Sequence, residues 1–271
     1  MADLPPAVSL PLTAVEPPSD GGRVPLLMAH GLFGQARNFA SPARRLAEST
    51  GRRVLTVDLR NHGAAPHDAR MDYPAMAADL AATIRTVGAP LVLFGHSMGG
   101  KAAMALALSH PELLAALIVA DIAPVGYQHH EHASIVEAMQ ALDLGTITRR
   151  SDADRALAAA LPDPGVRGFI VQNLEIAGGR ARWRPNLTAL AESMTAILGF
   201  PDDLPETAYE GPTLFLHGSR SSYVPASAHG RIRALFPDVE IQAIDAGHWL
   251  HAENPTAFAE ALEAWLATLG A

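Results

Sequence analysis

Ser97 lies at the centre of the pentapeptide 95–99 (Gly-His-Ser-Met-Gly), between two stretches of different character. The apolar run 90–94 before it predicts a buried strand, and residues 100–108 after it, small or apolar except for Lys101, predict a helix. A serine at such a strand-to-helix turn has its hydroxyl exposed above the sheet, and the two glycines let strand and helix approach closely. This context predicts a nucleophile elbow. The alternative is a tight turn with an incidental serine.

A serine hydroxyl becomes a good nucleophile only when a base removes its proton, and in this arrangement the base is a histidine on a late loop. His248 follows the last predicted strand and is the best candidate among the 12 histidines. Its place in the chain order matches the base of a Ser…Asp…His triad. The sequence therefore predicts that His248 deprotonates Ser97, the alternative being a buried structural histidine.

The acid that orients this histidine is less evident, because the loop 217–225 before the last strand contains no Asp or Glu. Asp121 follows the preceding predicted strand, and its carboxylate could hold the His248 ring in one tautomer and stabilise the imidazolium. Ser221 stands where the acid is usual, and we expect it to add a hydrogen bond to His248 or Asp121. The alternatives are a loop-capping role for Asp121, and Asp245 as the acid.

The negative charge that develops on the attacked carbonyl oxygen requires two main-chain N–H donors, which form an oxyanion hole. One is expected from Met98, directly after the serine, and the other from the loop 30–34. Within that loop we choose the N–H of Leu32, with Phe33 as the alternative. The side chains of Phe33 and Trp249 are expected to line the substrate pocket.

Composition excludes several classes of protein. The 271 residues are 49% hydrophobic and 18% charged, which suits a globular fold with a sizeable core rather than a disordered chain. The formal net charge of −8 argues against nucleic acid or an anionic membrane as a partner. Cys is absent, which removes thiolate metal sites and cysteine nucleophiles. With no signal peptide and no apolar run of ~18 residues, we expect a cytoplasmic protein without a membrane span.

Short apolar runs alternate with helical patterns along most of the chain, which predicts an α/β fold with a doubly wound, mostly parallel sheet. After an edge strand within 7–15, the expected strands are 24–29, 53–58, 91–94, 114–120, 213–217 and 239–244. The expected helices of this part are 42–49, 73–87, 98–109, 226–235 and 255–269.

The segment 127–205 departs from this alternation, because it contains helical patterns and no convincing strand. We interpret it as a helical cap inserted into a core made of residues 1–126 and 206–271. In open α/β sheets ligands bind at the carboxyl ends of the strands, so the cap is expected to cover the site. The helices expected within it are 135–142, 152–161, 166–174 and 186–198.

Together these motifs resemble those of the α/β-hydrolase superfamily, in particular the small YbfF-type esterases, a group with mitochondrial abhydrolase relatives. The resemblance implies Ser97, His248 and Asp121 as catalytic residues and Ser221 as an auxiliary one, since this group also has serine in place of the late acid. It implies activity on acyl esters and leaves acyl thioesters open. The matching stretches cover nearly the whole chain: 30–34 (HGLFG) with Asn38, 57–63 (VDLRNHG), 95–101 (GHSMGGK), 121–124 (DIAP), 183–187 (WRPNL) and 246–253 (AGHWLHAE).

The sequence thus predicts a serine hydrolase, a carboxylesterase that forms an acyl-enzyme at Ser97 and needs no metal or organic cofactor. Its expected partner is a small acyl ester or thioester, and its oligomeric state stays open. One alternative is a cofactor-free, haloperoxidase-like perhydrolase or a C–C bond hydrolase with the same triad. Another is a non-enzymatic binding protein of hydrolase shape. Dehalogenases and epoxide hydrolases are disfavoured because they call for Asp at position 97.

The remaining polar motifs are interpreted mainly as structural. We expect His30 to support the main chain of its loop, and Asp58 to organise the adjacent turn. Residues 60–62 are expected either to shape the pocket rim or to serve the turn at Gly63. The histidines of the segment 129–132 are expected to be exposed rather than to bind metal. Lys101 is not preceded by a phosphate-binding loop, so we exclude a phosphate site there.

Overall fold

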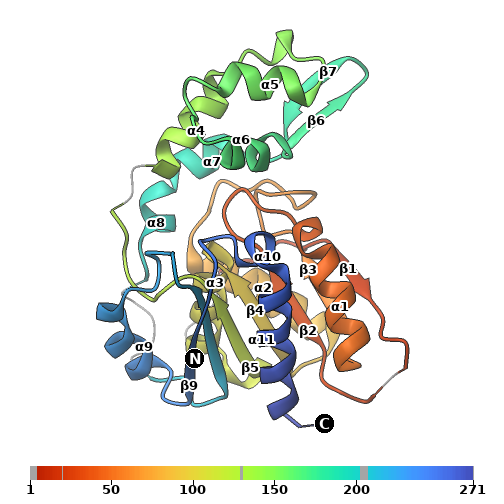
Figure 1. The fold of residues 1–271 in the computed structure, drawn as a ribbon, viewed down its shortest axis with the longest axis vertical. Coiled ribbons are helices and arrows are strands. Elements are labelled where there is room, and N and C mark those ends of the chain that lie inside the picture. The colour runs from red at the N-terminus through yellow and green to blue at the C-terminus, as the bar shows by residue number, and fades with distance from the viewer. Residues whose placement is uncertain (1–4, 20, 129–130, 202–206, 271) are drawn as a thin grey trace.

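The computed structural model describes residues 5–19, 21–128, 131–201 and 207–270. Its centre is a seven-stranded sheet in the order β1-β3-β2-β4-β5-β8-β9, in which β1 pairs antiparallel with β3 and all other pairs are parallel. This confirms the predicted α/β fold (Figure 1). The strands are β1 (Leu12–Val15), β2 (Leu26–Ala29), β3 (Val54–Val57), β4 (Leu91–His96), β5 (Leu114–Ala120), β8 (Thr213–Gly218) and β9 (Val239–Ile244).

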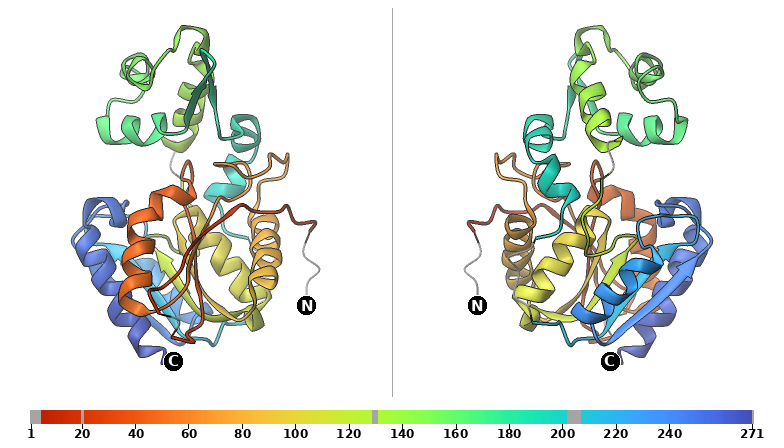
Figure 2. Two further views of the ribbon diagram at one scale, coloured as in Figure 1. Left: turned by 90° about the vertical axis from the view of Figure 1, so that its right-hand side faces the viewer. Right: turned by 90° about the vertical axis from the view of Figure 1, so that its left-hand side faces the viewer.

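Helices cover both faces of the sheet, which explains why the central strands are continuous apolar runs. Helices α1 and α11 pack on one face in one buried cluster, and α2, α3 and α9 pack on the other face (Figure 2). All six residues of β4 are buried. The helices of this part are α1 (Ala40–Thr50), α2 (Tyr73–Val87), α3 (Met98–Ser109), α9 (His229–Leu235), α10 (Leu250–Glu253) and α11 (Pro255–Thr268), with 3-10 turns η1 (Ala36–Phe39), η2 (Pro111–Leu113) and η4 (Ala226–Ala228).

The segment between β5 and β8 forms a separate layer above the carboxyl ends of the strands, where it covers the sheet as a cap (Figures 1 and 2). The sequence patterns of this segment predicted helices throughout. The structure has the helices, but the expected helix 186–198 is divided into α7 and α8 at Ser193. The elements are α4 (Glu131–Ala141), η3 (Leu144–Thr146), α5 (Arg150–Leu157), α6 (Pro164–Val171), β6 (Leu174–Ala177), β7 (Arg180–Trp183), α7 (Leu187–Glu192) and α8 (Met194–Leu198).

The hairpin β6–β7 differs from the expectation that the cap contains no strand. Its two-residue turn is Gly178-Gly179, and both glycines have positive φ, 57° and 75°. Such a turn matches the twist of paired strands and is open to glycine with little strain. The double glycine was therefore the available signal for a hairpin. Within the described part of the chain, no helix is long and apolar enough to cross a bilayer.

Candidate active site

Ser97 forms the turn between β4 and α3, with φ 51° and ψ −119°. A serine in this conformation is strained, and such strain persists only where the surroundings hold the residue in place. Its N–H donates to the Ala120 carbonyl oxygen at 2.9 Å. The flanking glycines permit the close contact of strand and helix, because a Cβ at Gly95 would lie 2.3 Å from the Gly99 oxygen. The predicted strand–turn–helix arrangement is therefore present.

His248 lies between Ser97 and Asp121 although the three residues come from distant parts of the chain. Its Nε2 is 3.1 Å from the Ser97 Oγ, and its Nδ1 is 2.7 Å from the Asp121 Oδ2. Asp121 directly follows β5 and is fully buried, and its Oδ1 accepts a hydrogen bond from the Gly218 N–H at 2.9 Å. A carboxylate at Nδ1 keeps the proton on that nitrogen, which leaves Nε2 free to accept a proton from the serine.

Two other residues considered with the acid lie in different surroundings. Ser221 donates to the Asp121 Oδ2 at 2.5 Å, so of the two expected partners it bonds the carboxylate. Asp245 is 79% exposed at its side chain and forms an ion pair with Arg220. The carboxylate of Asp245 is thus directed to solvent and to Arg220, and the carboxylate at the His248 ring is that of Asp121.

Residues 30–34, named the oxyanion loop here for the role expected of them, contain a tight turn closed by a 2.9 Å hydrogen bond from the Gly34 N–H to the Gly31 oxygen. The Phe33 N–H already donates to the His62 Nε2 at 3.1 Å, so it is not free for a substrate oxygen. No residue in the described ranges accepts from the Leu32 N–H. The Met98 N–H is in the first turn of α3, where N–H groups have no partner within the helix. Both N–H groups of the prediction are thus available.

His30 has the structural role that the sequence predicted. Its Nδ1 donates to the Gly31 oxygen at 2.8 Å, and its Nε2 accepts from the Leu59 N–H at 3.0 Å. Burial lowers the pKa of His30 to about 4, so the ring is neutral at pH 7. Asp58 likewise binds main chain, accepting from the N–H groups of Ala36 and Ala64.

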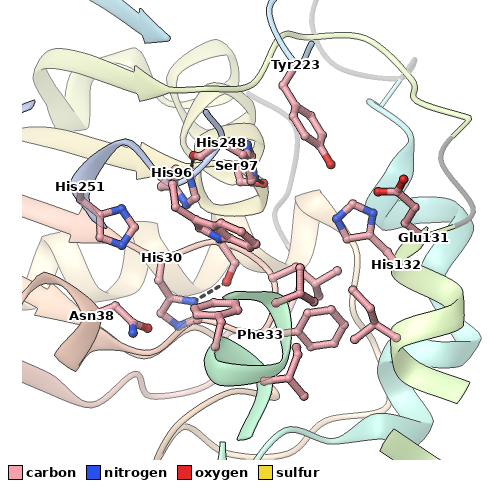
Figure 3. Close-up of a pocket in the computed structure, with 18 of the residues that line it drawn as sticks. His30, Phe33, Asn38, His96, Ser97, Glu131, His132, Tyr223, His248 and His251 are labelled. Atoms are coloured by element: carbon pink, nitrogen blue, oxygen red, sulfur yellow. Dashed lines mark hydrogen bonds between the residues drawn. The ribbon is translucent and has the colours of Figure 1, made fainter. Parts of the chain in front are cut away.

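A cavity of about 190 Å³ opens above Ser97, between core and cap (Figure 3). The cap contributes apolar side chains from α4 and α6, and the core contributes Phe33 and Trp249, the two residues expected at the pocket. The Phe169 ring of α6 packs on the Trp249 ring at 5.6 Å between centroids, which closes one wall of the cavity. The apolar cap residues are Ile135, Val166, Phe169 and Ile170.

The cap histidines lie partly outside the described residues, namely His129 and His130. His132 is half-buried and lines the cavity next to Glu131, and so differs from the exposed position that we expected (Figure 3). Among the residues that the structure describes, no three or more His, Asp or Glu side chains are grouped so as to hold a metal ion.

Two aromatic residues that the sequence analysis did not assign hold the His248 ring. Tyr223 stacks on it with the centroids 4.2 Å apart, and the His96 Nε2 donates to the His248 main-chain oxygen at 2.9 Å. Burial keeps the pKa of His96 well below its usual value, so this ring is neutral. The sequence signal for their contact with His248 was position alone, since His96 lies in the pentapeptide 95–99 and Tyr223 in the loop 217–225.

Lys101 joins the nucleophile helix to the end of the cap. Its buried Nζ donates to the main-chain oxygens of Leu198, at 2.9 Å, and Gly199, at 2.5 Å. It also lies 4.6 Å from the centroid of the Tyr127 ring. These carbonyls are at the carboxyl end of α8, where a cation is favourable. Burial lowers the pKa of Lys101 to about 7.

A family profile described as "Alpha/beta hydrolase family" matches residues 26–261. The chain belongs to this family. A mouse protein named sn-1-specific diacylglycerol lipase ABHD11 is 43% identical over 249 residues, which cover 89% of this chain and 80% of that protein. Esterase YbfF of Escherichia coli is 36% identical, and the match covers 89% of this chain and 92% of that protein.

Solved structures agree with this assignment. One titled "Marine microorganism esterase" has a TM-score of 0.89 and 31% sequence identity, with 96% of this chain and 100% of that chain covered. The predicted resemblance to the YbfF-type group, with its abhydrolase relatives, is therefore confirmed.

Proposed function

We propose that this α/β hydrolase cleaves acyl esters through a Ser97–His248–Asp121 triad and an acyl-enzyme intermediate. The protein is a carboxylic ester hydrolase, the class in which its relatives named esterase or lipase belong. The observation that carries the triad is the continuous contact from the Asp121 carboxylate through His248 to the Ser97 Oγ, at 2.7 and 3.1 Å. That contact lies directly beneath a largely apolar cavity.

In the first half-reaction the Ser97 Oγ attacks the carbonyl carbon of the ester while His248 Nε2 takes its proton. The carbonyl oxygen becomes an oxyanion that the N–H groups of Leu32 and Met98 stabilise. Asp121 stabilises the imidazolium without taking its proton. His248 then protonates the leaving alcohol, and the acyl group stays on Ser97.

In the second half-reaction water attacks the acyl-enzyme, and His248 Nε2 accepts the proton of that water. The oxyanion again lies at Leu32 and Met98. When it collapses, His248 returns the proton to the Ser97 Oγ and the carboxylic acid leaves. A thioester would follow the same steps with a thiol as the leaving group, so we include acyl thioesters among the candidate substrates.

Replacement of Ser97 by Ala tests this proposal. The fold should be retained and the kcat for p-nitrophenyl acetate and butyrate should fall by about 10⁴-fold or more, since the nucleophile is absent. A fluorophosphonate probe should label the native enzyme and leave the variant unlabelled. Ser193→Ala, in the cap between α7 and α8, is the matched control and should keep native turnover. Undiminished ester turnover in Ser97→Ala would contradict the assignment.

The probe also separates an enzyme from a binding protein of the same shape. A non-enzymatic scaffold would not react with the fluorophosphonate at Ser97, whereas an activated serine reacts readily. Ester turnover without labelling would point to a nucleophile elsewhere, and labelling without turnover would point to a different acyl acceptor or substrate class.

A further inference from the structure

The main chain of the oxyanion loop takes an unfavourable conformation at Phe33, whose φ is 60°. Phe33 is the third residue of the turn closed by Gly31 and Gly34, a position where a positive φ usually requires glycine. A bulky residue stays there only when contacts outside the turn hold it. The structure contains two such contacts, one on each side of Phe33.

The contact on the core side comes from His62. The Phe33 N–H donates to the His62 Nε2 at 3.1 Å, and the His62 Nδ1 donates to the Arg60 oxygen at 3.0 Å. A neutral imidazole has one donor and one acceptor nitrogen, so this arrangement uses both. Burial lowers the pKa of His62 to about 3, which keeps the ring in the neutral form that can accept from Phe33.

The contact on the cap side comes from Asn173, which lies between α6 and β6. Its Nδ2 donates to the Phe33 oxygen at 2.8 Å, and its Oδ1 accepts from the Gln35 Nε2 at 2.8 Å. Asn173 is fully buried, and its own main chain bonds to Ile170 and Arg184. Its side chain therefore has a fixed position and joins residues 140 apart in the sequence.

The orientation of this amide follows from its partners. The Phe33 carbonyl oxygen can only accept a hydrogen bond, so the Asn173 Nδ2 must face it. The Oδ1 then faces Gln35, which must donate through its Nε2. One orientation of both amides satisfies all of these groups, and the reverse orientation would leave buried polar atoms unpaired, at a cost in stability.

We propose that Asn173 is a positioning residue for ester hydrolysis, through which the docked cap holds the oxyanion loop in its active form. The inference rests on the proposed function, because it requires that the Leu32 N–H donate to the oxyanion. Leu32 precedes Phe33 in a closed turn, so a shift of Phe33 moves that donor. A displacement of about 1 Å can cost about 100-fold in rate.

A second contact between core and cap provides the matched control. The Arg37 Nη2 donates to the Gln172 oxygen at 2.5 Å, one residue before Asn173, and Arg37 is exposed. This bond joins the same cap segment to the core without touching Phe33. If Asn173 acted only by fastening the cap, loss of the Arg37 bond would have a comparable effect.

The variants to compare are Asn173→Asp and Arg37→Met. Asp has the shape of Asn and still accepts from Gln35, but it offers no donor to the Phe33 oxygen. For a p-nitrophenyl ester, Asn173→Asp should lower kcat by roughly 10- to 100-fold with KM changed less than about threefold. Arg37→Met should keep both constants within about threefold of the native values.

Inhibitors give a readout that a purely structural role would not change. The Ser97 Oγ adds to the carbonyl carbon of a trifluoromethyl ketone and forms a hemiketal oxyanion that resembles the transition state. The Ki of this inhibitor should therefore rise in Asn173→Asp by the factor by which kcat/KM falls. A ketone that binds without addition should keep its affinity. Circular dichroism and thermal unfolding show that each variant is folded. If Asn173→Asp does not fold, Gln35→Met, which frees the Asn173 amide, should still lower kcat by about 3- to 10-fold.

Three outcomes would overturn the inference: native kcat in the folded Asn173→Asp or Gln35→Met enzyme, an equal loss in Arg37→Met, or a Ki for the trifluoromethyl ketone that does not follow kcat/KM. The failure of the proposed function would look different. In that case Ser97→Ala would keep its turnover, whatever Asn173→Asp does.

Discussion

Of the histidines near Ser97, His30, His62, His96 and His248 have hydrogen-bond partners that separate their roles. Both ring nitrogens of His30 and of His62 form hydrogen bonds with main-chain groups, and His96 donates to a main-chain oxygen. Of the four, His248 joins a carboxylate on one nitrogen to the Ser97 hydroxyl on the other. A base for Ser97 needs a free acceptor nitrogen at the hydroxyl. The hydrogen-bond partners of the rings, and not only their distance from Ser97, therefore identify His248 as the proposed base.

The acid of the triad can be tested at the same scale. Asp121→Asn would keep the size of the side chain but favour the His248 tautomer with its proton on Nε2, which cannot accept from Ser97. We expect kcat for a p-nitrophenyl ester to fall roughly 10³- to 10⁴-fold. Asp245→Asn is the matched control on the exposed surface and should stay within about twofold of native. A larger loss in Asp245→Asn than in Asp121→Asn would reverse the assignment.

Sequence reasoning singled out Ser97, His248 and Asp121, which the structure brings into contact, because each side-chain type and its place after a strand carry a signal. It did not find Asn173, and it assigned His62 to the pocket rim or to the turn at Gly63 rather than to the Phe33 N–H. Their partners are the N–H and carbonyl groups of Phe33, and main-chain atoms leave no residue type in the sequence to recognise. The bond from Asn173 also depends on how the cap docks, which no local pattern describes.

At the scale of elements, the nucleophile elbow requires that α3 lie almost in contact with β4 and with the oxyanion loop. A Cβ at Gly99 would lie 2.5 Å from the His30 oxygen, and one at Gly95 would lie 2.3 Å from the Gly99 oxygen. These neighbours are main chain and cannot rotate away. The two glycines thus set the spacing between strand, helix and loop that places Ser97 near its N–H donors.

Gly95→Ala should therefore destabilise the fold by at least about 1–3 kcal/mol, the usual cost of overpacking, and lower kcat as the elbow shifts. Gly230→Ala is the control, because position 230 lies inside α9 with open space around it. Alanine there should raise the free energy of unfolding by about 0.5–1 kcal/mol. Urea unfolding measures both values. A Gly95→Ala protein as stable and as active as the native one would contradict the close-packing argument.

The elements also differ in how well their sequences predict them. The bounds of α2 and α3 were predicted to the residue, since long apolar periodicity and flanking breakers define them. The hairpin β6–β7 was missed because its strands are four residues long and partly exposed. Pairs across the strands add to its stability, such as Glu175 with Arg182 at 2.7 Å, and pairing partners become visible only when the register is known.

At the scale of the whole molecule, buried neutral histidines make stability depend on pH. The pKa of His30 is lowered to about 4 and that of His62 to about 3, against 6.5 for the unfolded chain. Between pH 6.5 and the folded values the unfolded state binds more protons, so the free energy of unfolding falls as pH falls. For His30 the loss is on the order of 3 kcal/mol by pH 4, and it is absent above about pH 7.

His62→Gln should remove one proton that the unfolded chain binds and the folded protein does not. The free energy of unfolding should then change less steeply between pH 6.5 and 3, by up to about 1.4 kcal/mol per pH unit. The slope is the readout, because the variant also loses packing. Asn186→Ala removes a nearby bond between cap and core without removing an imidazole, so its curve should run parallel to that of the native protein. Parallel curves for His62→Gln would show that its burial does not couple to protons.

The cap and the core each supply one wall of the cavity, so the cap side chains that line it should set substrate preference. Phe169 on α6 faces the cavity and packs on Trp249, whereas Val171 lies on the same helix and does not line it. Phe169→Ala should raise KM severalfold for long-chain esters and less for acetates, with kcat nearly unchanged, because apolar contact is lost equally in the ground and transition states.

Val171→Ala, the matched control, should lower stability without shifting this chain-length profile. Equal shifts in both variants would mean that the cap acts through its stability rather than through its cavity wall.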